Sequence, residues 1–301
     1  MASVTLRQLR YFEALARLRH FGRAAEACAI SQPALSVQMK ELEALLGAPL
    51  VERGAREIRL TRLGEALAPR ARDVLRAVDE IEDLARASQR PFAGRLALGV
   101  IPTVAPYLLP ALMTELARTW PELEVRPRET VTGALVRDLL DGRLDAAIVA
   151  LPISEPALVE TPLLREEFLL VRPQADAGRP VPSADSLREM RLLLLEEGHC
   201  FRDQALSFCG MSSGPPRDLM EGSTLATLVQ MVAVGIGVTL IPEMAAPVET
   251  ASAAVSVARL SEPRPTRTIG MVWRRSSPLA DQLERIAAQV RRCAPAEAAP
   301  A

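Results

Sequence analysis

The residues best suited to chemistry in this sequence are His199, Cys200 and Cys209. The 301-residue chain has only four cysteines and two histidines, and three of these six lie within one short segment. An apolar run at 192–195 precedes them and predicts a buried strand, whereas 200–208 has helical composition. Cys200 is therefore expected at a helix N-terminus, where unpaired N–H groups and the helix dipole favour a thiolate.

The neighbours and spacing of these cysteines indicate a redox switch. Arg202 adds a positive charge two residues from Cys200, and His199 can donate or accept a proton beside it. In a continuous helix Cys200 and Cys209 would be separated by about 13.5 Å along the axis and roughly 180° around it. Because a disulfide needs Cα atoms within about 7 Å, the thiols can join only if the helix unwinds or its end moves. Glycine, serine and proline residues in 210–216 predict a flexible, non-helical segment directly after this helix. The alternative is two unrelated cysteines, one capping a helix and one packing with Phe208.

Composition indicates a globular chain long enough for two or three domains, with 49% apolar and 24% charged residues. The net charge is −1, but residues 1–62 carry ten Arg or Lys against six Glu, which leaves −5 for the remainder. A basic N-terminal part suits nucleic-acid contact. Four scattered cysteines, no apolar leader and no run near about 18 apolar residues predict reduced thiols in the cytoplasm and no membrane association.

Residues 1–61 are expected to form a DNA-binding domain. Thr5 can cap a first helix, 21–28 is a short second helix, and Ser31 can cap a third that ends at Gly47. Two short helices around a tight turn are typical of a helix-turn-helix, and 49–53 and 57–61 predict the strands of a wing. The alternative is a small helical core with an incidental polar surface. Side chains suited to bases and phosphates begin the third helix and the wing: Gln32, Pro33, Ser36, Gln38, Lys40 and Arg53.

A long amphipathic helix is expected over 62–90. Its apolar residues alternate spacings of four and three, as in a coiled coil, although a helix packed on its own domain is the alternative. Pro69 should kink this helix or shift its start. From 91 to 301 strands and helices alternate, which predicts an α/β effector domain with ligands at the carboxyl ends of strands. We expect lobe I at about 91–163 and 267–301, and lobe II at about 164–266.

Several motifs resemble the LysR-type transcriptional regulators, namely Leu-Arg-Gln-Leu-Arg-Tyr-Phe at 6–12, Ala-Ala-Glu at 24–26, Ser-Gln-Pro-Ala-Leu-Ser at 31–36, Leu-Glu-Ala-Leu-Leu-Gly at 42–47 and Leu-Thr-Arg-Leu-Gly at 60–64. The resemblance implies a winged helix-turn-helix, a dimerising linker helix and a two-lobed, periplasmic-binding-protein-like effector domain. It also implies double-stranded DNA and RNA polymerase as partners, and a homodimer or homotetramer. Val37 departs from the polar or basic residue of many members, which affects base preference.

Three further motifs, at 101–110, 197–209 and 267–270, resemble the hydrogen-peroxide-sensing members of this family. The resemblance implies that Cys200 is the peroxidatic thiol, that Cys209 resolves it as a disulfide, and that a thiol reductant such as glutaredoxin or thioredoxin reverses the reaction. It further implies a peroxide pocket of Thr103, Thr132, His199 and Asp203. Arg267 is expected to tune the thiol, as is Arg202. These donors suit a reaction whose leaving group is hydroxide.

Two other functions remain open from the sequence. One is a conventional LysR-type regulator with an organic inducer between the lobes, and the other is a thiol peroxidase with an accessory DNA-binding domain. We expect a regulator and not an enzyme. Cys28 should pack in the helix-turn-helix core, and Cys293 should belong to the C-terminal tail. The two histidines lie far apart in sequence, so no metal site or cofactor is expected.

Overall fold

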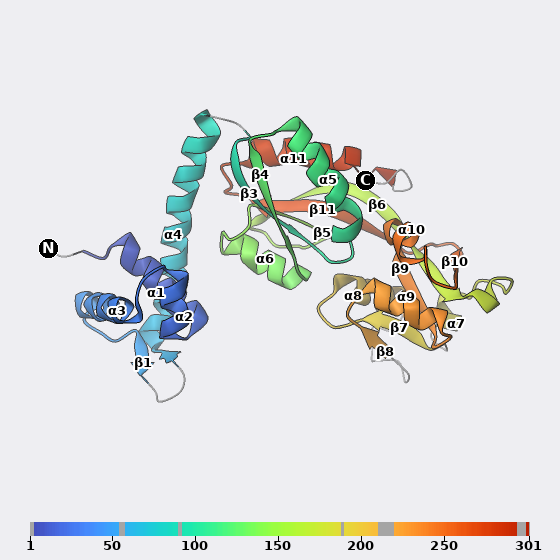
Figure 1. The fold of residues 1–301 in the computed structure, drawn as a ribbon, viewed down its shortest axis with the longest axis horizontal. Coiled ribbons are helices and arrows are strands. Elements are labelled where there is room, and N and C mark those ends of the chain that lie inside the picture. The colour runs from blue at the N-terminus through green and yellow to red at the C-terminus, as the bar shows by residue number, and fades with distance from the viewer. Residues whose placement is uncertain are drawn as a thin grey trace. The chain divides into compact units, whose positions relative to one another are not determined.

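The computed structural model describes residues 3–53, 58–89, 92–187, 190–209, 220–293 and 299–300 (Figure 1). They form two compact units, Met1–Ala85 and Arg86–Ala301, each with its own buried core. Three predicted features lie outside the described residues: the tip of the wing at 54–57 with the side chain of Arg53, the helix exit at 210–216, and most of the tail after Cys293.

The N-terminal unit has the predicted winged helix-turn-helix. The Thr5 side chain accepts a hydrogen bond from the Gln8 backbone N–H in a capping box. Ser31 caps the third helix, and Gly47 ends that helix with a φ of 73°. The wing strands pair antiparallel, with Val51 opposite Leu60. Cys28 packs partly buried against the core, as predicted. The elements are α1 (Leu6–Leu18), α2 (Phe21–Ala27), α3 (Gln32–Leu46), β1 (Val51–Arg53), β2 (Ile58–Leu60) and α4 (Arg62–Gln89).

Helix α4 changes from buried to exposed along its length. Ala71 is buried in the core of the unit, whereas the side chains of Val74 and Ile81 are 44% and 66% exposed. Pro69 lies inside the helix, which begins at Arg62, so the proline does not set the start. An apolar stripe that continues beyond its own core supports dimerisation through α4, which stays a prediction.

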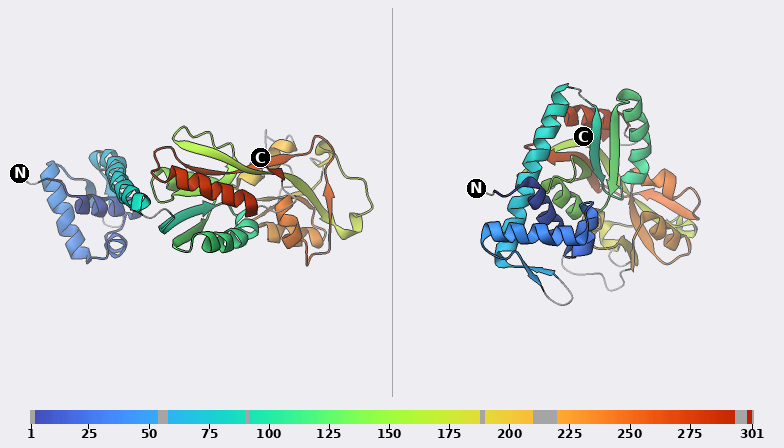
Figure 2. Two further views of the ribbon diagram at one scale, coloured as in Figure 1. Left: turned by 90° about the horizontal axis from the view of Figure 1, so that it is seen from above. Right: turned by 60° about the vertical axis from the view of Figure 1, so that its left-hand side comes forward.

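The effector unit begins with the predicted alternation of strands and helices. Strand β3 pairs in parallel with both β4 and β5. Helices α5 and α11 lie side by side in lobe I (Figure 2), where Gln289 of α11 donates to Glu115 of α5. The elements are β3 (Gly94–Val100), α5 (Ala105–Thr119), β4 (Leu123–Glu129), α6 (Thr132–Leu140), β5 (Ala146–Leu151) and, at the far end of the chain, α11 (Ala280–Cys293).

Two long antiparallel strands, β6 (Leu158–Pro173) and β11 (Thr266–Arg274), join this part to the second part of the unit. The sheet order is β4-β3-β5-β11-β6-β9-β7-β8, with β10 and β12 also paired to β6. The sequence did not predict the short elements α7, β8, β10 and α10. The remaining elements are η1 (Gln174–Asp176), α7 (Ala184–Leu187), β7 (Leu192–Leu195), α8 (Cys200–Phe208), β8 (Met220–Gly222), α9 (Leu225–Ala233), β9 (Val238–Pro242), η2 (Glu243–Ala245), α10 (Ala246–Glu249), β10 (Val255–Arg259) and β12 (Ala299–Pro300).

The effector unit contains two apolar cores, and we name its lobes by them. The core of lobe I takes its buried residues from 92–164 and 269–290, together with Met244. The core of lobe II takes its buried residues from 168–260. Cys293 is the last residue of α11 and packs against the core of lobe I, so the prediction that it belongs to the tail was wrong.

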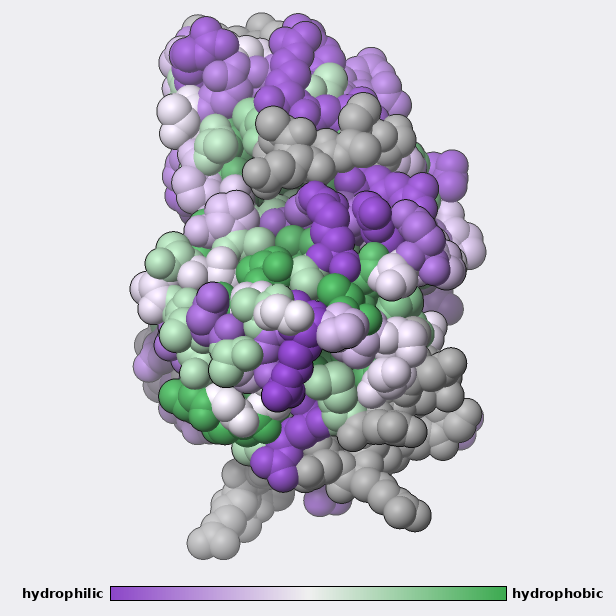
Figure 3. All heavy atoms as spheres, turned by 90° about the vertical axis from the view of Figure 1, so that its right-hand side faces the viewer, coloured by the Kyte–Doolittle hydropathy of each residue, from purple (hydrophilic) through white to green (hydrophobic). Residues whose placement is uncertain are grey.

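The outer face at the lobe II end mixes apolar and charged side chains (Figure 3). Such a mixture is ordinary, because more than half of a folded protein's surface is apolar. None of the helices in the described ranges has the length and apolarity needed to cross a bilayer.

Candidate redox site

Cys200 is the first residue of α8, as predicted, and His199 is its N-cap. The turn before the helix depends on Gly198, whose φ of +95° disfavours any side chain. A Cβ at Gly198 would lie 3.8 Å from the Val131 side chain, so the turn adjoins the start of α6. Cys200 therefore lies where the chain turns into α8, at the N-terminal end of the helix.

The two thiols of α8 face different cores. Phe201, Ala205 and Cys209 follow a spacing of four and lie in the core of lobe II, where Cys209 is 0% exposed. Cys200 is half-buried and packs against the core of lobe I. Both are reduced thiols. The two cysteines are nine positions apart, which places their Cα atoms about 13.5 Å apart along the axis, so α8 must unwind before a disulfide can form.

Arg267 connects the lobe I residue Thr103 to α8. Its Nη1 donates to Thr103 Oγ1 at 2.8 Å and its Nη2 donates to the Thr103 carbonyl at 3.0 Å. Its Nε donates to Glu166 Oε1 at 2.8 Å, and both charged side chains are 0% exposed. The guanidinium also lies 5.3 Å from the ring centroid of Phe201, the residue after Cys200. Two of the predicted site residues, Thr103 and Arg267, are therefore in direct contact.

Two buried polar atoms near this site have no hydrogen-bond partner among the described residues. They are Thr132 Oγ1, at the start of α6 beside Val131, and Gln204 Oε1, one helical turn after Cys200. An unsatisfied buried polar group costs about 1–3 kcal/mol, so such groups are uncommon without another role. Gln204 was not among the predicted residues, and its only signal in the sequence is its position four residues after Cys200.

His199 is half-buried, and burial lowers the pKa of its imidazole, with Glu196 opposing the shift. The neutral ring can then accept one proton and donate another. Asp203 is exposed on the first turn of α8. Their parts in peroxide binding stay predictions. Within the described ranges, no three His, Cys, Asp or Glu side chains form a group that could hold a metal ion.

Arg202 is directed toward two strands of lobe II. Its Nη1 donates to the Leu195 carbonyl at the end of β7 at 2.9 Å and pairs with Glu221 of β8 at 2.6 Å. The buried guanidinium thus fastens the first turn of α8 to the sheet. A tuning effect on the thiol stays a prediction.

The predicted DNA-binding residues lie along α3. Gln32, Pro33 and Lys40 are exposed, whereas Ser36 and Gln38 are half-buried. Gln38 Nε2 donates to Glu41 at 2.7 Å, which leaves its second N–H and its Oε1 for contact with a base. This polar face suits a recognition helix, and the individual contacts stay predictions.

Comparison with known families accounts for both units. Residues 6–65 match the model described as bacterial regulatory helix-turn-helix protein, LysR family, and residues 89–294 match the LysR substrate binding domain. The chain belongs to the LysR family. In LysR terms, α8 and its two thiols lie within the substrate-binding domain, and α3 lies within the DNA-binding domain.

Several LysR relatives have similar sequences or structures. A probable hydrogen peroxide-inducible genes activator of Streptomyces viridosporus is 43% identical, over 95% of this chain and 93% of its own length. The DNA-binding transcriptional dual regulator OxyR of Escherichia coli K12 is 41% identical, over 96% and 95%. A full-length OxyR variant from Pseudomonas aeruginosa has a TM-score of 0.78 at 38% identity, over 98% and 97%. A hydrogen-peroxide-bound OxyR variant from Corynebacterium glutamicum has a TM-score of 0.65 at 35% identity, over 97% and 93%.

Proposed function

We propose that this LysR-family chain is a transcriptional regulator that senses hydrogen peroxide through Cys200 and Cys209. The observation that carries the proposal is the arrangement of α8, which presents one thiol at its N-terminus and holds the other in a separate core. A bond between these thiols forces local refolding, so oxidation becomes a change of shape. The names of the similar proteins, which refer to hydrogen peroxide and to gene activation, support the same reading.

The chemistry has two balanced steps. The Cys200 thiolate attacks one oxygen of hydrogen peroxide, the O–O bond breaks, and Cys200 becomes a sulfenic acid while hydroxide leaves and takes a proton to form water. The Cys209 thiol then attacks the sulfenic sulfur, and the S–S bond forms as a second water leaves. Thr103, Thr132, His199 and Asp203 are proposed to hold the peroxide and assist the leaving oxygen, with Arg267 as their support.

The readout is proposed to pass to DNA. Refolding of α8 would change how subunits of a homodimer or homotetramer meet, and hence how paired α3 helices span double-stranded DNA. RNA polymerase would respond to that change in the cytoplasm. A dithiol reductant of the glutaredoxin or thioredoxin type would restore the thiols. A sensor of this kind should react about once per thiol and then remain oxidised until it is reduced, whereas sustained multiple turnover with a reductase would indicate a thiol peroxidase.

The test is thiol titration with peptide mapping before and after one equivalent of hydrogen peroxide. We expect a disulfide joining Cys200 to Cys209 that a dithiol reverses. Cys200→Ser should abolish this reaction and leave DNA binding intact, whereas Cys209→Ser should stop at the sulfenic acid. Survival of both thiols in the unmodified protein would refute the proposal and return attention to an organic inducer between the lobes.

A further inference from the structure

We infer that Glu166 is a positioning residue for the reaction of Cys200 with peroxide. It acts by holding Arg267 in the one orientation that makes the Thr103 hydroxyl a hydrogen-bond donor to the reacting oxygen. The inference rests on the proposed function. It adds a residue that is distant in sequence from every predicted site residue and is proposed to act through Arg267, its partner across the sheet.

The Glu166 carboxylate is fixed at both oxygens. Oε1 accepts from Arg267 Nε at 2.8 Å, and Oε2 accepts the Met244 backbone N–H at 3.0 Å. Glu166 of β6 is also the direct antiparallel partner of Arg267 of β11. Because both side chains are fully buried, neither can exchange its partner for water, and the pair has one geometry.

That geometry determines what Thr103 can do. An arginine side chain only donates, so Thr103 Oγ1 must accept from Arg267 Nη1 at 2.8 Å. The single hydroxyl proton of Thr103 then points away from Arg267 and is available to another acceptor. A hydroxyl fixed as a donor stabilises the negative charge that develops on the leaving oxygen of peroxide.

The same guanidinium contacts the helix that carries the reacting thiol. Arg267 lies 5.3 Å from the ring centroid of Phe201, and that ring packs against Phe168 at 4.7 Å between centroids. Through the Arg267 side chain, Glu166 therefore fixes the position of Thr103 relative to the first turn of α8. Without this carboxylate, Arg267 would shift and the Thr103 donor would lose its direction.

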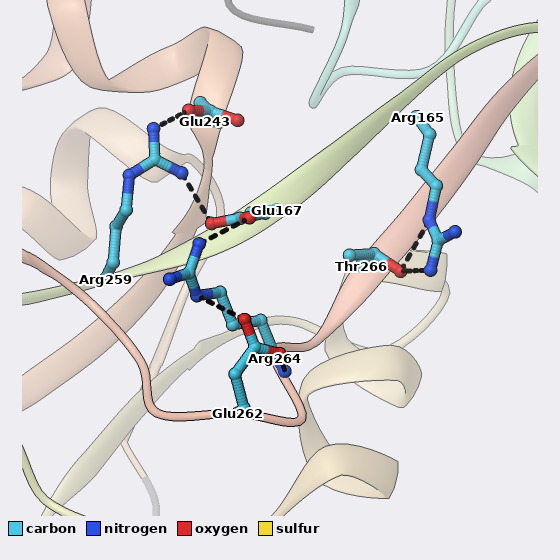
Figure 4. A network of polar contacts seen from close by, with 7 residues as sticks. All are labelled: Arg165, Glu167, Glu243, Arg259, Glu262, Arg264 and Thr266. Carbon is cyan, nitrogen blue, oxygen red and sulfur yellow. Dashed lines mark hydrogen bonds and ion pairs between the residues drawn. The ribbon is translucent and has the colours of Figure 1, made fainter. Parts of the chain in front are cut away.

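The next residue, Glu167, provides a matched control. Side chains alternate along a strand, so Glu167 lies on the other face of β6 from Glu166. It pairs there with Arg259 and with Arg264, the latter at 3.0 Å (Figure 4). Glu167 belongs to a different ion-pair network and makes no contact with Arg267 among the interactions of the described residues.

The experiment compares two reagents on the reduced full-length chain. The rate of Cys200 modification is measured by rapid quenching and peptide mass spectrometry, with hydrogen peroxide and with iodoacetamide, whose iodide needs no proton donor to leave. In Glu166→Gln the ratio of the peroxide rate to the iodoacetamide rate should fall about 10- to 100-fold, the effect of a misplaced reacting group. In Glu167→Gln the ratio should stay within about 2-fold of the unmodified protein.

An unchanged ratio in Glu166→Gln would overturn the inference. If both rates fall equally, the carboxylate acts only on the thiolate or on folding, and if neither rate falls, it has no part in the reaction. If that variant does not fold, Glu166→Asp keeps the charge and withdraws the carboxylate by one methylene. It should lower the same ratio, and a ratio equal to that of the unmodified protein would again overturn the inference. If Cys200 of the protein without substitutions is inert to peroxide but is alkylated by iodoacetamide, the proposed function itself is refuted.

Discussion

Replacing Arg202 with alanine should accelerate the step in which Cys209 reaches oxidised Cys200. This step needs α8 to unwind, and Arg202 fastens the first turn of that helix to β7 and β8 through the Leu195 carbonyl and Glu221. Arg202→Ala removes both contacts from the reduced form. The disulfide-bonded form no longer has an intact α8 to fasten, so the substitution weakens the starting state more than the product.

The size of the effect follows from the two contacts. A charged hydrogen bond is worth about 1.5–3 kcal/mol, and the one to Leu195 is buried. The Glu221 side chain is 42% exposed, so that ion pair is discounted to below about 1 kcal/mol. A loss of about 2 kcal/mol corresponds to a rate increase of about 30-fold if the contacts are broken in the transition state.

The assay separates the two chemical steps. Rapid quenching with a sulfenic-acid trap gives the bimolecular rate of Cys200 oxidation and the first-order rate of disulfide closure. Arg179→Ala is the control, because it removes a 75% exposed arginine paired with Asp176 in the same lobe, away from α8. Urea unfolding of the reduced form should show the matching loss of about 2 kcal/mol for Arg202→Ala and little for the control.

One pattern of results would refute the reasoning. If reduced Arg202→Ala is less stable but closes no faster, then the Arg202 contacts persist while Cys209 approaches Cys200. If the main change is instead in the bimolecular rate, Arg202 tunes the thiol and does not restrain the helix.

Three further predictions concern other parts of the chain. Thr132→Val should slow oxidation of Cys200 but leave the urea midpoint of the reduced form unchanged or slightly higher, because it removes a buried hydroxyl without a partner among the described residues; a large loss of stability would contradict this. Burial lowers the pKa of His199 in the folded chain. Between this lowered pKa and the usual pKa of about 6.5, the unfolded chain therefore binds more protons than the folded chain. This contribution to stability is present above about pH 6.5 and is lost on acidification, and His199→Gln should flatten that decline in urea midpoints measured from pH 7 to 5. Lys40→Ala should weaken binding to all DNA sequences alike and lower the slope of log affinity against log salt by about 1; a change confined to one operator would indicate a base contact.

The sequence predicts the fold well where local signals decide it. Thr5 and Ser31 begin their helices because a side-chain oxygen satisfies an unpaired amide, and Cys200 begins α8 after a Gly198 turn. The opposite orientation of Cys200 and Cys209 followed from helical spacing alone. Short elements such as β8 and β10 were missed because their three and five residues carry too little periodicity.

The site was less predictable where contacts are long-range. Glu166 and Arg267 are separated by 101 residues, and only the pairing of β6 with β11 brings them together. Arg202 has contacts that the sequence did not predict, because residues two apart on a helix face different ways. Proximity in sequence suggested a charge beside the Cys200 thiol, whereas the guanidinium binds the strands on another side of α8.

The burial of Cys209 in the core of lobe II has a consequence for the range of peroxide the protein can report. In the proposed mechanism, the sulfenic acid on Cys200 cannot react with Cys209 while α8 remains folded, and a second peroxide can convert it irreversibly to sulfinic acid. The two fates are equally frequent when the rate of second oxidation, which rises with peroxide concentration, equals the rate of helix opening. Below that concentration most oxidised molecules form the reversible disulfide, and above it most are converted irreversibly to the sulfinic acid. The stability of one nine-residue helix therefore determines the upper limit of the useful signal.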